Sequence, residues 1–334
     1  MWGKHRSTAM ALLQPQIFAP QFGAGTTLAA VAPPASPWWP DLAQMRSATH
    51  TRRSNLGRQL KLAWALLSAL PHRAQFHQVL RQHPHWLPLF SQQPRSFEPL
   101  LQSFIDRRYR TAQRFAHLQH DLASATQAFG AATCARIARG ERVELWHLTG
   151  VGPVCLEANR VCRREGLWSL GLWTDAGLRL CQLSFSVLRG DRLTIGSVQG
   201  APAHDAQAMQ GVRDATHAAA GLRPPHLLVE LLRVLCQRGC LALQGVDPQH
   251  HVKRRWHQRV LAVSFDYCGF WAGLGGQRLV NGFWSLPAQR PPRDLADVPA
   301  KRRAMYRRRS ALLDALSGQL MHLPGLAQPV PLAA

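Results

Sequence analysis

The sequence contains few acidic residues and almost no lysine. Its 334 residues include 18 Asp and Glu against 40 Lys and Arg, a formal charge of +22, and only four of the forty are lysine. Such an excess attracts nucleic acids and other anionic partners without selecting among them. Arginine also suits bidentate contacts with phosphate. Codon bias alone would produce the same composition. The two explanations coexist, and the charge by itself defines no chemistry.

Long apolar segments are also lacking. The longest candidate, Leu62–Leu70, has nine residues between Lys61 and Pro71, whereas a membrane span needs about 20. We expect a short packed helix there, and no cleaved signal peptide at the amino end. The seven cysteines form no Cys-x-x-Cys pair and are odd in number. This pattern indicates reduced thiols, no zinc site and a cytoplasmic protein.

Hydrophobic periodicity divides the chain into four parts. Residues 1–54 are rich in Pro and Ala and are expected to be a flexible leader. Residues 55–135 repeat apolar positions at helical spacing and predict a helical subdomain. Residues 136–322 begin with alternating patterns, typical of antiparallel strands, and continue with helices and strands in turn. Residues 323–334 are expected to be a tail. The predicted fold class is α+β, with a mostly antiparallel mixed sheet and flanking helices.

Individual elements of the second half can be placed by the same patterns. Strands are expected at 143–150, 152–160, 166–175, 178–188, 192–200, 241–246 and 278–286. Helices are expected at 204–220, 224–239, 264–274 and 294–320.

Two places at element ends have the character of an anion site. Gln199 and Gly200 end the strand at 192–200, and the ends of strands are where ligands often meet a sheet. Gly221 and Arg223 come directly before an apolar helix, whose first backbone N–H groups attract anions. On this local pattern alone, a plain turn at residues 199–200 and a structural helix cap at residues 221–223 are the favoured explanations.

The segment after the strand at 241–246 combines acidic, basic and imidazole side chains. Asp247, His250 and His251 are followed by four basic residues around Trp256. Neighbouring histidines diverge on a strand or a helix, so a metal site is not expected. Basic residues beside one Trp suit a phosphate backbone, and a solvated charged face is the alternative.

The final helix carries a dense basic run, Lys301–Arg309. At 100° per residue its cations spread around the whole circumference, while Met305, Leu312 and Leu316 fall within about 40° of one another. This pattern indicates a helix that docks through a narrow apolar stripe. A helix that reads DNA would concentrate its cations on one side.

Several blocks in this order resemble the VirK/YbjX family of bacterial proteins. The blocks are residues 183–200, 221–224, 245–252, 264–276, 282–287 and 301–314. The resemblance covers about residues 60–320. It implies an association with bacterial virulence, with the envelope or with the response to antimicrobial peptides, and it implies no established activity.

The element order also resembles the GNAT-type acyltransferase fold. That likeness implies acyl-CoA as cofactor, held by the helix after Arg223, with Tyr267 as candidate general acid. Asp247, His250 and His251 are candidate bases. The loop before the helix reads AAAGLRPP, and its prolines lack the N–H donors that the GNAT loop supplies.

Three hypotheses follow from the sequence. The first is a family member of unassigned activity, an acyltransferase if it is an enzyme. The second is a non-catalytic binder of nucleic acid or anionic surfaces, and the third is a regulatory interaction protein. An opening between strands 192–200 and 241–246, lined by Arg223, His250 and Tyr267, would favour the enzyme. A filled opening would favour binding alone.

Overall fold

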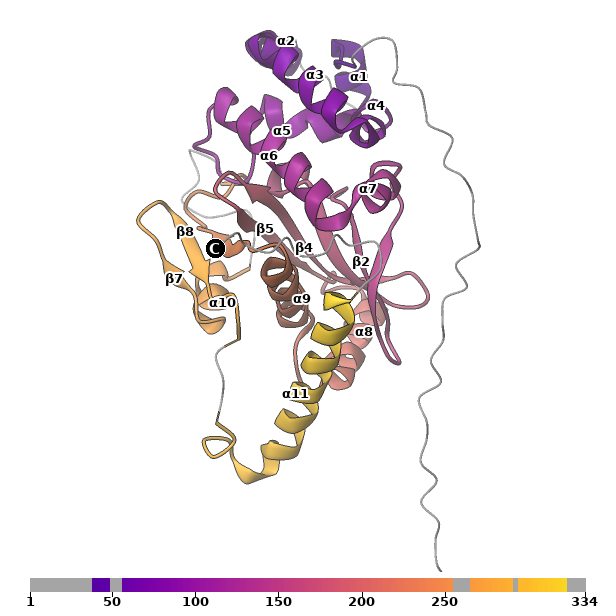
Figure 1. The fold of residues 1–334 in the computed structure, drawn as a ribbon, viewed down its shortest axis with the longest axis vertical. Helices are drawn as coiled ribbons and strands as arrows, with labels where there is room; N and C mark the ends of the chain where they lie inside the picture. The colour runs from indigo at the N-terminus through magenta and orange to yellow at the C-terminus, as the bar shows by residue number, and fades with distance from the viewer. Residues whose placement is uncertain (1–37, 49–55, 255–264, 291–293, 323–334) are drawn as a thin grey trace, which may run out of the picture. The chain divides into compact units, whose positions relative to one another are not determined.

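One sheet of eight strands organises the described part of the chain (Figure 1). The structure is a computed structural model, and it describes residues 38–48, 56–254, 265–290 and 294–322. The tail predicted at 323–334 and most of the predicted leader lie outside these ranges. The predicted α+β class is confirmed, because helices precede the sheet and further helices alternate with its last strands.

The strand order in the sheet is β1-β2-β3-β4-β5-β6-β8-β7. The strands are β1 (Val143–Leu148), β2 (Gly152–Ala158), β3 (Trp168–Trp173), β4 (Arg179–Leu188), β5 (Arg192–Gly200), β6 (Ala242–Val246), β7 (Gln277–Arg278) and β8 (Phe283–Leu286). The predicted meander is confirmed, because β1 to β5 pair with their neighbours in antiparallel fashion. β6 then pairs with β5 in parallel, and β8 with β6 in antiparallel fashion.

One group of helices precedes the sheet, and a second lies between and after its last strands. The first group is α1 (Leu42–Ala48), α2 (Leu56–Ala69), α3 (Arg73–Gln82), α4 (Leu87–Ser91), α5 (Glu98–Leu101), α6 (Thr111–Phe129) and α7 (Ala131–Ala138). The second is α8 (Ala206–Ala218), α9 (Pro224–Arg238), α10 (Tyr267–Gly273) and α11 (Ala300–Met321). Short 3₁₀ turns lie between helices of the first group, at η1 (Leu70–His72), η2 (Pro84–Trp86) and η3 (Pro94–Phe97), and a further one, η4 (Arg163–Glu165), lies between β2 and β3.

Part of the predicted leader packs against the helices. Residues 38–48 were expected to belong to the leader, yet the Trp39 ring lies 5.0 Å from Phe97 and 5.9 Å from Phe76. Met45 on α1 is buried. Aromatic side chains of this size bury a large apolar area, which explains why this stretch packs although it lacks a sustained period.

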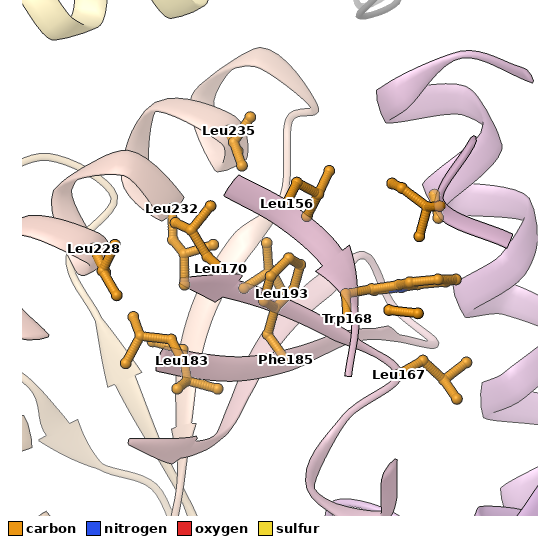
Figure 2. Packing of buried hydrophobic residues seen from close by; sticks show 14 of the residues in the cluster. Leu156, Leu167, Trp168, Leu170, Leu183, Phe185, Leu193, Leu228, Leu232 and Leu235 are labelled. Atoms are coloured by element: carbon orange, nitrogen blue, oxygen red, sulfur yellow. The ribbon is translucent and has the colours of Figure 1, made fainter. Parts of the chain in front are cut away.

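The main core lies between α9 and the sheet. Figure 2 shows Leu228 and Leu232 of α9 near Leu170 and Leu183, which lie on β3 and β4. α9 begins with two prolines, whose missing N–H groups cost nothing in the first helical turn. Nearly every later position of α9 is buried, so this helix stabilises the sheet that positions the site.

The last helix packs beside α9, as its apolar stripe predicts (Figure 1). Leu316 is buried, and Met305 and Leu312 are half-buried. Arg309 is buried as well, and its guanidinium donates hydrogen bonds of 3.0 and 3.1 Å to the carbonyl oxygen of Ala220. Most other cations of the run are exposed around the helix, so they form no single reading face.

Candidate functional site

The two parallel strands of the sheet differ in length at their carboxyl ends. Their last paired residues are Ile195 and Gly245. β6 ends one residue later, while β5 continues to Gly200 and pairs there only with β4. Ligands often bind at the carboxyl ends of parallel strands. The space beside residues 196–200 is therefore the place where a site was expected.

Tyr267 of α10 fills this space. Its hydroxyl oxygen accepts a hydrogen bond of 3.2 Å from the backbone N–H of Val198, and its side chain is buried. Its ring lies 5.5 Å from the ring of His251. Burial raises the pKa of the phenol, so the hydroxyl stays protonated. In this position the candidate acid closes the end of β5.

His251 and Glu165 form a buried charged cluster next to Tyr267. Both side chains are fully buried, and Nε2 of His251 lies 3.6 Å from Oε1 of Glu165. Nδ1 of the histidine accepts a hydrogen bond of 3.1 Å from the backbone N–H of Lys253. The Lys253 ammonium lies 2.7 Å from the same glutamate oxygen. Burial is the main cause that lowers the pKa of His251, which favours its neutral form.

Gln199 belongs to this cluster too. Its amide donates a hydrogen bond of 3.1 Å to Oε2 of Glu165. The neighbouring Gly196 has no room for a side chain, because a Cβ there would overlap the backbone oxygen of Glu165. η4 therefore lies directly against β5, and the close approach places the glutamate at the strand end.

Asp247 and His250 lie in a second charged cluster, with Asp106 and Arg108. The Asp247 carboxylate is buried and lies 2.6 Å from Nε of Arg278. Asp106 is also buried and holds the Arg108 guanidinium at 2.6 to 3.0 Å. Burial is the main cause that lowers the pKa of His250, and Arg108 lowers it further. Each carboxylate here is already neutralised by an arginine.

A backbone bridge joins the two clusters. Asp106 pairs with His251, and the N–H of Arg107 donates to the carbonyl oxygen of His250 over 3.0 Å. The segment before α6 and the segment after β6 are thereby held side by side. Sequence reasoning missed Asp106 and Glu165. A sequence feature could have pointed to them, because each is a single acid beside basic residues in a chain that has few acids. Asp106 lies in IDRRYR, and Glu165 lies in RREG.

The predicted anion site lies elsewhere, at the start of α9. Gly221 has φ +76, and a side chain there would meet Met305 and Arg309 of α11. Arg223 is exposed at the N-cap position, and α9 starts with Pro224. The first two helical positions therefore offer no N–H donor, so any anion held here must be bound mainly by side chains.

Arginine side chains gather around His226 in the first turn of α9. Burial is the main cause that lowers the pKa of His226, and four guanidinium groups lower it further: Arg223, Arg290, Arg309 and Arg233. Within the described residues, the buried Nδ1 of His226 has no hydrogen-bond partner. The positive potential at this helix start thus comes from three separate parts of the chain.

A cavity of about 710 Å³ lies between α9 and α11, and the residues after β8 form part of its wall. Its charged lining consists of Arg233, Arg290, Arg307, Arg309, Glu230 and Asp314. Arg233 is neutralised by Glu230 at 2.8 Å. Arg290 and Arg307, in contrast, make no hydrogen bond or ion pair with any residue that the structure describes. Two guanidinium groups are therefore available to a ligand.

The structure thus divides the predicted site residues into two groups. Asp247, His250, His251, Tyr267 and Gln199 gather at the strand ends, and Gly221 and Arg223 lie at the start of α9. Helix α10 links the strand ends to the first turn of α9, because the ring of Tyr267 lies against His251 and the ring of Phe270 lies 5.0 Å from that of His226. Gly200 is exposed at the end of β5, and among the described residues no atom beyond its chain neighbours lies within 4 Å of its Cβ position.

Comparison with known proteins identifies the family. The family model described as "Protein of unknown function (DUF535)" matches residues 51–322, so the chain belongs to this family. Two uncharacterized proteins of Haemophilus influenzae are 28% and 29% identical to it, over 75% of this chain and 84% of each of theirs. The resemblance to the VirK/YbjX family is confirmed, because the uncharacterized protein YbjX of Escherichia coli is 30% identical over 47% of this chain and 49% of its own.

A further relative is named membrane protein LapB, from Mannheimia haemolytica. It is 26% identical over 64% of this chain and 93% of its own length. No helix in the described ranges of our chain combines the length and apolar character needed to cross a bilayer. No solved structure matches the chain at a significant level, so the likeness to the GNAT-type fold stays a prediction.

Proposed function

We propose that this chain acts by binding a small anionic ligand that carries phosphate groups, in the cavity between α9 and α11. The observation that supports this most is the pair Arg290 and Arg307, which line the cavity without a partner among the described residues. Guanidinium groups bind phosphate through paired hydrogen bonds. The volume of about 710 Å³ lies within the usual range of small-molecule sites, about 300–1,000 Å³.

Binding without catalysis is favoured over acyl transfer by the strand ends. The hydroxyl of Tyr267 and the carboxylate of Asp247 are both engaged inside the protein. His251 is fully buried and uses Nδ1 as an acceptor. A general base must reach the proton that it removes, and these groups meet each other instead of an open space. Coenzyme A is still a member of the ligand class, through its phosphates.

Calorimetric titration with inorganic pyrophosphate, ADP and coenzyme A tests this proposal. We expect binding, a higher melting temperature, and affinity losses of about tenfold for Arg290→Ala and for Arg307→Ala. Arg302→Ala is the matched control, because Arg302 is exposed on α11, the helix that carries Arg307, and does not line the cavity. The proposal is wrong if none of the three compounds binds, or if the control loses as much affinity.

The same titrations separate the alternatives. A short nucleic-acid duplex that binds more tightly than all three small ligands would favour a nucleic-acid binder. Release of free thiol from acetyl-CoA in the presence of amine acceptors would favour acyl transfer; we expect none above the rate without protein.

We further propose that the bound ligand serves the envelope or stress responses that the VirK/YbjX resemblance implies, and that the chain works in the cytoplasm. All seven cysteines lie in described segments and are free thiols, which suits a reducing compartment. The relative LapB is named a membrane protein, which suits a role near the envelope. Cell fractionation, and survival of a deletion strain exposed to a cationic antimicrobial peptide, test this placement.

A further inference from the structure

Helix α2 has apolar side chains on two opposite faces. One face packs against α1 and α5 and includes the buried Leu66 and Ala69. The sequence predicts a packed helix at Leu62–Leu70; the helix spans Leu56–Ala69 and is packed on one side only. At 100° per residue, Leu56, Leu60, Trp64 and Leu67 lie within about 80° of one another on the other side.

This second face is exposed to solvent. The exposed fractions are 69% for Leu56, 61% for Leu60, 72% for Trp64 and 59% for Leu67. We call these four residues the outer stripe of α2. Single exposed leucines are ordinary on a protein surface, but a contiguous stripe that includes a tryptophan marks an interaction site.

The surrounding sequence favours an anionic partner. No acidic residue occurs between Asp41 and Glu98, and Asp41 is the first acid of the chain. Lys61 is exposed on α2 itself, and Arg73 and Arg81 are exposed on α3, the next α-helix. An apolar stripe with basic residues and an interfacial tryptophan is typical of helices that lie in the surface of an anionic membrane.

Two other occupants suit the stripe less well. A helix of 14 residues is about 21 Å long, so its outer face offers a few hundred Å² at most, against about 800 Å² per partner in a stable interface. A second copy would also bring like charges together. The segment 1–37 of the same chain contains Lys4 and Arg6 and no acid. Its charge therefore does not favour packing against the basic surroundings of the stripe.

We propose that the outer stripe of α2 is a contact site for anionic phospholipid bilayers, with Trp64 and the three leucines inserted at the level of the headgroups and Lys61 near the lipid phosphates. The helix lies in the bilayer surface and does not cross it. This site goes beyond the ligand cavity at α9 and α11, and it uses none of the cavity residues.

Sedimentation of the full-length protein with lipid vesicles tests the proposal. We expect binding to vesicles of phosphatidylethanolamine and phosphatidylglycerol, much weaker binding to phosphatidylcholine alone, and a loss on adding salt. Trp64→Ser and Leu67→Ser should each lower the partition coefficient by about tenfold, since each removes most of a large apolar side chain. Both side chains are exposed, so the variants should fold; their urea midpoints check this.

Val280→Ser is the matched control, because Val280 is a fully exposed apolar residue before β8. It should bind vesicles like the parent, as should Arg290→Ala, which weakens only ligand binding in the cavity. Unchanged vesicle binding by Trp64→Ser would overturn the proposal. Two other results would also overturn it. In the first, the protein binds no vesicles and forms a dimer that Leu60→Glu dissociates. In the second, the protein binds vesicles only after residues 1–37 are removed.

Discussion

The side-chain hydroxyl of Tyr267 accepts a 3.2 Å hydrogen bond from the backbone N–H of Val198, beside the part of β5 that extends past β6. A backbone donor at the edge of a sheet would otherwise be buried without a partner, at a cost comparable to a lost hydrogen bond. The tyrosine thus takes the place of a ladder partner, and the opening between the parallel strands is filled.

Replacing Tyr267 by Phe should therefore destabilise the protein. The ring still packs, but the Val198 N–H loses its acceptor, and we expect a loss of about 1–3 kcal/mol in the free energy of unfolding. Tyr267→Ala should cost more, about 3–5 kcal/mol, since it also leaves a cavity. Urea unfolding measures both. An unchanged midpoint for Tyr267→Phe would mean that this hydroxyl has no structural part.

Two glycines of β5 should differ in how far they tolerate alanine. A Cβ at Gly196 would overlap the backbone oxygen of Glu165, whereas Gly200 faces open space. We expect Gly196→Ala to lose about 1–3 kcal/mol of stability, and Gly200→Ala to stay within about 0.5 kcal/mol of the parent. Thermal unfolding of the pair is the measurement, and equal melting temperatures would contradict the close approach of η4 to the strand.

Replacing the buried Glu165 should cost more stability than replacing an exposed glutamate that is paired with two arginines. Glu165→Gln removes the buried carboxylate that pairs with the partly exposed Lys253 ammonium and accepts from Gln199, and we expect a loss of about 2–4 kcal/mol. Glu141 lies at the surface between Arg136 and Arg139, so Glu141→Gln should change stability by less than about 1 kcal/mol. Chemical denaturation compares the two, and similar losses would contradict a structural role for the buried cluster.

Taken by itself, Asp121 should make the protein less stable as pH rises from about 4 to about 7. Burial raises the pKa of this carboxyl to about 7, despite hydrogen bonds from Ser186, from the Val187 N–H and from Trp168. The folded state therefore holds a proton that the unfolded chain releases near pH 4. This contribution is complete below about pH 4 and is lost as pH rises through about 7, by at most about 1.4 kcal/mol per pH unit.

Asp121→Asn removes this titration, while its side-chain oxygen can still accept from Trp168 and from the Val187 N–H. The difference in unfolding free energy between variant and parent should thus change steadily between about pH 4 and 7. A constant difference across that window would show that Asp121 is ionised in the folded protein.

Ligand binding in the cavity should be accompanied by proton uptake at His226. Burial and four arginines lower the pKa of this histidine, and a bound anion would raise it by adding negative charge. Affinity for pyrophosphate should then increase as pH falls through the titration range of the histidine. Calorimetry in buffers of different ionisation enthalpy measures the protons taken up.

His226→Asn should abolish this uptake, and His147→Asn, at an exposed histidine on β1, should leave it unchanged. Uptake that persists in His226→Asn would place the titrating group elsewhere.

Periodicity predicted the meander because a strand pattern can be recognised in a few consecutive residues. It did not show that nearly every position of β2 to β5 would be buried, on both faces of the sheet. The stripe of α11 was predictable for the same local reason. The packing of Trp39 and Met45 was not, since it depends on aromatic partners in η3 and α3. The apolar residues of α2 also could not show which face of the helix would pack against other helices and which would be exposed.

The sequence by itself determined the α+β class, the order of the elements, the family and the charge that favours an anionic partner, because these follow from local patterns and composition. Only the tertiary structure decided that the predicted site residues form two groups, that Tyr267 fills the end of β5, and that Arg290 and Arg307 line one cavity. The bond between Tyr267 and Val198 joins residues 69 positions apart. Contacts at that separation depend on how whole elements pack, and no local pattern encodes them.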